Sequence, residues 1–101
     1  MDGHRTAERR SLAYHRAIAA RLVAEPQLLV SARERVARWC ATGEVHDRYA
    51  RAWSTLLARD VDAIARDLGE DSERMRALRQ ASPFAGALDA RTRWQLWRSI
   101  A

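Results

Sequence analysis

Hydrophobic residues recur along the chain at helical spacing, in six segments separated by turn residues. One stripe of the first segment holds Leu12, His15, Ala19, Leu22 and Val23. Residues three or four positions apart share a helix face, so this pattern indicates amphipathic helices. We predict helices over residues 6–24, 26–41, 46–58, 61–68, 73–81 and 90–98.

Capping and turn residues mark the ends of these segments. Pro26 suits a helix start, where its missing N–H costs nothing. Gly43 follows the second segment and can adopt the left-handed conformation that ends a helix, and Gly69 ends the fourth. At helix starts, a side-chain oxygen accepts a bond from an unpaired helical N–H. The residues in that place are Asp60, Asp71 or Ser72, and Asp89.

The pattern predicts an all-α fold, a compact bundle of five or six helices. We expect a single helical domain over residues 1–101, with residues 1–5 frayed. A tight turn at Pro26 joins the two longest helices, which favours an antiparallel hairpin. The shorter C-terminal helices would then cover one end or side of that hairpin.

Composition supports a globular helical protein. Of 101 residues, 48% are hydrophobic and 31% charged, with only four glycines and two prolines. The lone cysteine, Cys40, allows no intramolecular disulfide. The chain has no apolar run of about 18 residues and no signal peptide at its start, so we expect a cytoplasmic protein without membrane association. All basic residues are Arg, as a GC-rich bacterial genome would produce.

Charge is unevenly distributed in this basic chain, which carries a net +5. Residues 60–73 hold six acids and one Arg, whereas residues 74–98 hold six Arg and one acid. Part of this follows from helix chemistry, since acids suit helix starts and bases suit helix ends. A solvated face explains the rest, and so would a basic docking surface for nucleic acid or for an acidic protein.

The sequence offers no convincing catalytic or metal-binding set. Its histidines are His4, His15 and His46, and His15 lies in an apolar stripe typical of a core or partner-packing residue. Arg10 and His15 have a spacing found in small helical ribonucleases, a weak signal among eighteen arginines. Cys40 with dispersed histidines falls short of a zinc ligand set, and no phosphate-binding glycine loop exists. We expect no enzyme activity and no cofactor.

Residues 64–78 have the outline of a helix-turn-helix. Ala65 stands four positions before Gly69, and apolar Met75 and Leu78 follow at core spacing. Two features oppose this interpretation. Glu70 occupies a place that is usually apolar, and Asp71 and Glu73 put acid at the start of the recognition helix, where phosphate would approach. The arginines that would reach phosphates or bases are Arg74, Arg76 and Arg79.

The segment 82–98 is the least generic part of the chain. Its loop carries Phe84 and Leu88 where loops are ordinarily polar, and its helix carries Trp94 and Trp97. These residues suit either the closing of a helical core or the docking of a partner, since Trp and Arg are enriched at binding hot spots. The two roles are compatible if one Trp faces inward and the other outward.

The motifs at 11–19, 21–22, 26 and 32–39, with 77–86 and 93–94, resemble a family of small helical bacterial proteins. The module is similar to the region that follows an Xre-type DNA-binding domain in some actinobacterial regulators, often encoded beside a nucleotidyltransferase-like toxin. The resemblance covers about residues 10–98. Its distinctive positions are Leu78, Arg79, Gln80, Ser82, Pro83, Phe84, Gly86, Arg93 and Trp94.

The resemblance implies an antitoxin, and the lack of a separate DNA-binding domain before residue 10 favours neutralisation by contact with the toxin. We expect an aromatic and Arg-rich surface to cover the toxin's active site, with acids of residues 60–71 mimicking phosphate there. The alternative is a DNA-binding regulator using residues 64–79. The sequence does not decide whether the chain forms homo-oligomers. The residues expected to bind the partner are Arg79, Gln80, Phe84, Arg91, Arg93, Trp94, Trp97, Asp67, Glu70 and Asp71.

Overall fold

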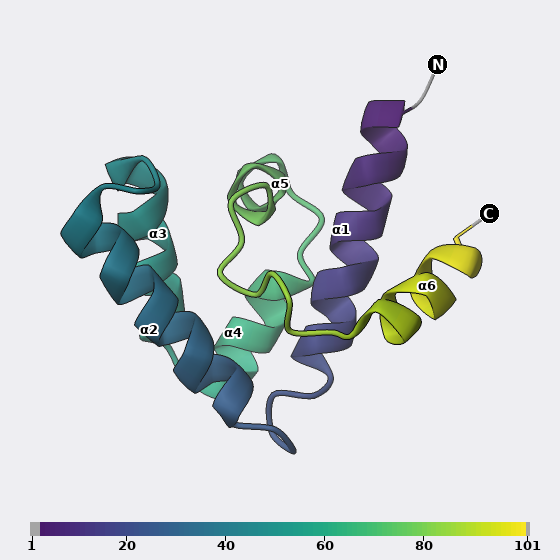
Figure 1. Cartoon of the computed structure of the whole chain (residues 1–101), viewed down its shortest axis with the longest axis horizontal. Helices are drawn as coiled ribbons and strands as arrows, with labels where there is room; N and C mark the ends of the chain where they lie inside the picture. Colours follow the sequence, from purple (N-terminus) through teal and green to yellow (C-terminus); the bar gives the residue numbers. More distant parts are fainter. Residues whose placement is uncertain (1–2, 101) are drawn as a thin grey trace.

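A computed structural model describes residues 3–100, which form six helices and no strand. Figure 1 shows α2 and α3 side by side, α4 and α5 in the middle, and α1 and α6 at the opposite side. None of these helices combines the length and the hydropathy that crossing a membrane requires. The helices are α1 (Gly3–Ala19), α2 (Gln27–Thr42), α3 (Asp47–Leu57), α4 (Val61–Leu68), α5 (Glu73–Arg79) and α6 (Ala90–Arg98).

The predicted caps are present at most helix boundaries. Asp60, Ser72 and Asp89 each accept a hydrogen bond from the backbone N–H three residues later. Gly43 takes the left-handed conformation at φ 73° and donates its N–H to the Trp39 carbonyl, ending α2. Gly69 ends α4 at φ −96°, a backbone conformation that does not require glycine. A Cβ there would lie 3.2 Å from Cγ of Arg16.

The first helix differs from its predicted range at both ends. It begins at Gly3, inside the segment 1–5 that we expected to be frayed; Met1 and Asp2 lie outside the described residues. It stops at Ala19 rather than Ala24, because tight turns with i→i−3 hydrogen bonds follow. These turns bury Leu22 and leave Val23 79% exposed, so Val23 does not belong to the core stripe.

The predicted hairpin of the two longest helices is not confirmed. Helix α2 packs chiefly against α3, whereas α1 packs against α4, α5 and α6 (Figure 1). The turn residues between Ala19 and Gln27 separate α1 from α2, and the short turn at Gly43 joins α2 to α3 instead.

The core lies between α1 and the α2–α5 helices. Trp53 and Phe84 are its largest members, with their ring centroids 6.2 Å apart in an edge-to-face arrangement. Trp53 is fully buried and donates its indole N–H to the Leu78 carbonyl at 3.1 Å. Each of the helices α1 to α5 thus contributes fully buried apolar side chains, whereas α6 has no fully buried residue and packs against the core through the partly buried Leu96.

Candidate functional site

The last helix carries the most exposed large aromatic of the described chain. Asp89 caps α6 by accepting from the Thr92 N–H at 2.7 Å, and this backbone bond is the main reason its carboxyl pKa is lowered. Trp94 is 60% exposed on α6. Helix α6 packs mainly on α1, at the edge of the molecule (Figure 1). The condition under which the core and docking roles are compatible is therefore met on the outward side by Trp94.

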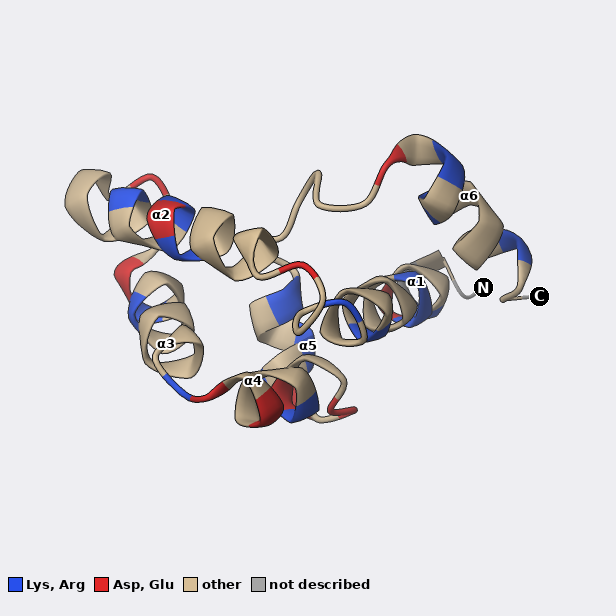
Figure 2. Cartoon of the chain, turned by 90° about the horizontal axis from the view of Figure 1, so that it is seen from below, with Lys and Arg blue, Asp and Glu red and all other residues tan. Residues whose placement is uncertain are grey.

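Trp97 lies between α6 and α1, flanked by two cations. The guanidinium of Arg10 is 5.2 Å from the ring centroid, and that of Arg93 is 5.9 Å from it. Such stacks place positive charge over the negative face of the ring. Figure 2 shows basic segments on both α1 and α6 at this side of the molecule. We call Arg10, Arg93, Trp94 and Trp97 the Arg–Trp face.

Hollows flank the α1–α6 contact. One, of 370 Å³, is lined by residues that include Tyr14, Gly86 and the Arg10–Trp97–Arg93 stack. Another, of 510 Å³, is lined by Leu12, Ala13, Ala17, Leu96 and Ile100 with Arg9 and Arg16. An Arg-rimmed surface with apolar hollows is typical of protein-binding patches.

The Pro-Phe-Ala-Gly loop, residues 83–86, is held by hydrogen bonds from side chains of α1 and α2. Tyr14 donates its hydroxyl proton to the Phe84 carbonyl at 2.7 Å, and Arg35 donates to the carbonyls of Pro83 and Ala85. Phe84 is 1% exposed, which places it in the core and out of a partner's reach. The loop thus holds the connection to α6 and is not itself the docking surface.

His15 anchors the same loop from α1. Its Nδ1 lies 2.7 Å from the Ser11 carbonyl oxygen and therefore carries the proton, so Nε2 accepts from the Ser82 hydroxyl at 2.7 Å. Burial lowers the pKa of His15 to about 4, with a smaller contribution from Arg79. A histidine this buried and this weakly basic fits a structural role. Arg10, its supposed partner in a ribonuclease-like pair, instead lies over Trp97.

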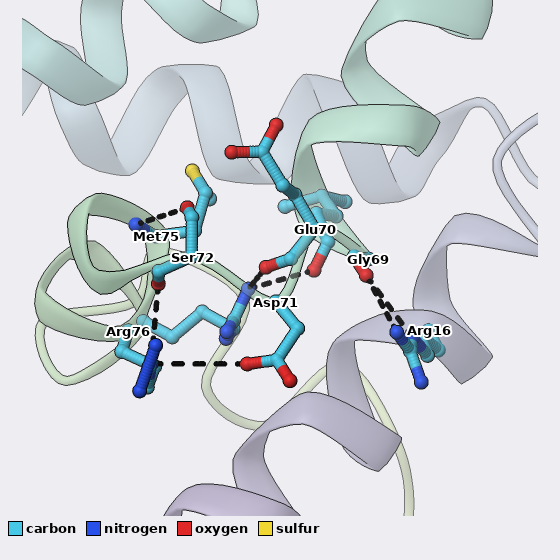
Figure 3. A network of polar contacts seen from close by, with 9 residues as sticks. Arg16, Gly69, Glu70, Asp71, Ser72, Met75 and Arg76 are labelled. Atoms are coloured by element: carbon cyan, nitrogen blue, oxygen red, sulfur yellow. Dashed lines mark hydrogen bonds and ion pairs between the residues drawn. The ribbon is translucent and has the colours of Figure 1, made fainter.

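Arg79 is a buried structural residue rather than a surface arginine. It is 4% exposed, and its Nη1 donates to the carbonyls of Leu68 and Glu70 at the end of α4. Arg16 reaches the Gly69 carbonyl from α1 at 3.0 and 3.1 Å (Figure 3). Cations suit a helix C-terminus, so these contacts stabilise the end of α4. Burial lowers the pKa of Arg79.

The three acids expected to bind the partner, Asp67, Glu70 and Asp71, lie on another side of the molecule from the Arg–Trp face. Helix α1 separates α4 from α6 in both Figure 1 and Figure 2. Asp67 pairs with Arg59, and Asp71 approaches Arg76 at 3.7 Å, while Glu70 is exposed. Gln80 is exposed immediately after the end of α5, and Arg91 is exposed on α6. The ten expected partner-binding residues therefore do not form one surface.

Few of the arginines in the predicted helix-turn-helix are free to contact DNA. Met75 and Leu78 are buried as the pattern predicted, but α5 has only seven residues. Arg76 is engaged with Ser72 and Asp71 (Figure 3), and Arg79 is buried. Only Arg74 is exposed among the three arginines expected to touch DNA.

The structure adds two residues to the site that sequence reasoning missed. Arg10 and Tyr14 of α1 meet α6 and its loop across seventy or more positions of sequence, a contact that no local pattern predicts. Among the described residues, no three His, Cys, Asp or Glu side chains are placed to hold a metal. The His4 side chain lies outside the described part, His46 caps α3, and Cys40 is an exposed thiol.

Comparison with protein-family models, curated proteins and solved structures finds no match to this chain. The candidate site therefore rests on its own geometry.

Proposed function

We propose that the protein is an antitoxin that binds and neutralises a toxin enzyme by direct contact through the Arg–Trp face. One observation carries this proposal: α6 has no fully buried residue, yet it holds two tryptophans and three arginines. Exposed Trp is unfavourable in water, and Trp with Arg is the composition of binding hot spots. The motif resemblance to toxin-neutralising proteins supports the same function.

The proposed mechanism is physical occlusion. The toxin's surface would cover Trp94, and the arginines of the face would pair with acidic groups at the rim of that contact. The acids of α4 and its following turn belong to a second surface, so a phosphate-mimicking role for Asp67, Glu70 and Asp71 would require a partner large enough to reach around α1. Two of these three acids already have ion-pair partners, which favours the Arg–Trp face as the main contact.

Co-expression of the tagged chain with the products of neighbouring genes tests the proposal. We expect recovery of a stoichiometric protein that is toxic when expressed alone, in a complex that persists in moderate salt because an apolar contact carries it. Recovery of DNA alone, with affinity that falls steeply as salt rises, would contradict the proposal and favour a regulator that uses residues 64–79.

A further inference from the structure

The hollow beside Trp97 has the shape of a small binding pocket. It measures 370 Å³ and lies between α1, α6 and the turn at Ala85 and Gly86. Tyr14 and small residues give it partly apolar walls, while Arg10 and Arg93 supply charge. Sites of this kind, concave and apolar with a few polar groups, bind a defined chemical group rather than a broad surface.

The pocket's charge is not compensated within the described chain. Two guanidinium groups lie over a single indole ring, at 5.2 and 5.9 Å from its centroid. None of the ion pairs between the described side chains, which do not include that of His4, involves Arg10 or Arg93. Two like charges at one ring raise the local positive potential, so the pocket favours an anion.

Two of the residues that line the pocket each carry a buried hydrogen-bond donor without an acceptor. Nε of Arg93 and Nε1 of Trp97 are both buried without a partner. Trp53 shows the usual arrangement, since its buried Nε1 donates to a carbonyl oxygen. Buried donors are nearly always paired because leaving them unpaired is unfavourable. An oxyanion that enters the pocket, with a small shift of the flexible arginines, would satisfy both.

We infer that this pocket receives the carboxylate of an Asp or Glu side chain presented by the protein partner. Arginine binds a carboxylate through two parallel hydrogen bonds, and two guanidinium groups at the rim of one open hollow suit a single carboxylate. Exposed Trp94 on the same helix provides an adjacent apolar contact for the partner's backbone or a neighbouring side chain. This inference rests on the proposed function and specifies what the partner must carry.

A nucleic acid is a poorer match for this surface. A polyanion needs a continuous basic track that follows its backbone. Here the basic residues of α1 are interrupted by Glu8, and α6 starts beside Asp89. The pocket is one hollow with apolar walls, which suits one charged group better than a chain of phosphates.

Titration of the labelled full chain by NMR tests the pocket without the partner. The indole N–H signal of Trp97 is followed while hexaglutamate is added, with hexaglutamine and a thymidine heptanucleotide as comparison ligands. We expect hexaglutamate to shift the Trp97 signal more than either. In R10Q and in R93Q the affinity should fall about tenfold, the effect of losing one charge-assisted hydrogen bond.

Arg98 provides the matched control, since it is exposed at the end of the same helix and does not line the pocket. R98Q should bind hexaglutamate as the parent chain does. An equal loss in R98Q, a stronger response to the oligonucleotide, or no response to hexaglutamate would each overturn the inference. Circular dichroism of each variant shows whether the fold is retained.

The partner complex separates this inference from the proposed function. If the chain recovers a toxin but R10Q and R93Q bind it as tightly as the parent, the pocket inference is wrong and the proposed function stands. If hexaglutamate binds as expected but no toxin is recovered, the proposed function is wrong and the carboxylate pocket stands.

Discussion

Trp53 and Trp97 place the same side chain in two opposite settings. Trp53 is fully buried, packs on Phe84 and donates its N–H to Leu78. Trp97 sits under two arginines at the edge, with its N–H unpaired. The first arrangement is complete within the fold, and the second is not. Tryptophan content alone therefore does not distinguish the two positions; they differ in whether the fold completes the contacts around the ring.

Trp53→Ala should have the largest effect on stability. Removing a fully buried Trp leaves a cavity and an unpaired Leu78 carbonyl, so we expect a loss of about 3–5 kcal/mol in the free energy of unfolding. Denaturant unfolding followed by circular dichroism measures it. A loss below 1 kcal/mol would show that the core does not depend on Trp53.

Acid should weaken the core side through His15. Its pKa is about 4 in the folded chain and 6.5 in the unfolded one, so the unfolded state binds the proton more tightly. The contribution of neutral His15 to the free energy of unfolding is fully present above pH 6.5. It is lost as the pH falls toward 4, by about 3 kcal/mol in total. H15Q should remove the pH dependence of the free energy of unfolding between pH 6.5 and 5.5, a range in which carboxylates titrate little. A parent chain with equal stability at pH 7 and pH 5 would contradict this prediction.

Trp94→Ala, unlike Trp53→Ala, should lower affinity for the partner and leave stability almost unchanged. Because Trp94 is 60% exposed, its removal should change stability by no more than about 0.5 kcal/mol. Affinity for the toxin should fall about 30-fold, or about 2 kcal/mol, as expected of a hot spot. Calorimetric titration measures the affinity. Val30→Ala, at a position 53% exposed on α2, is the matched control and should leave binding unchanged.

Neutralising exposed acids of α4 and of the turn that follows it should have the smallest effect. Asp62→Asn with Glu70→Gln changes two exposed acids on the surface away from the Arg–Trp face. Exposed charges contribute little to stability, and we expect toxin inhibition to weaken less than about threefold. Inhibition assays against the purified toxin check this. A loss of tenfold or more would show that phosphate mimicry by this surface is the main mechanism.

Local features of the fold were predictable from sequence, because they depend on neighbours in the chain. The caps at Asp60 and Asp89 and the left-handed Gly43 are of this kind, and α4 has its predicted bounds. The early end of α1 was not predictable, since Ala, Arg and Leu after Ala19 all favour continuing a helix. Helix α1 ends at Ala19 because the turns that follow it bury Leu22 in the core.

The candidate site was only partly predictable, because burial is a tertiary property. Trp94 and Arg93 are on the expected surface, but Phe84 and Arg79 are buried. An arginine in a polar helix pattern is normally exposed, and nothing local shows that Arg79 fastens the end of α4. Arg10 joined the site only through the α1–α6 contact.

Hydrogen exchange along the chain, alone and in complex with the recovered toxin, tests the central claim most directly. We expect the amides of α6 to exchange fast in the free chain, since α6 has no fully buried residue, and to become strongly protected in the complex, while those of α2 and α3 change little. Protection confined to α2–α3 or to the α4–α5 turn, with α6 unchanged, would contradict the account.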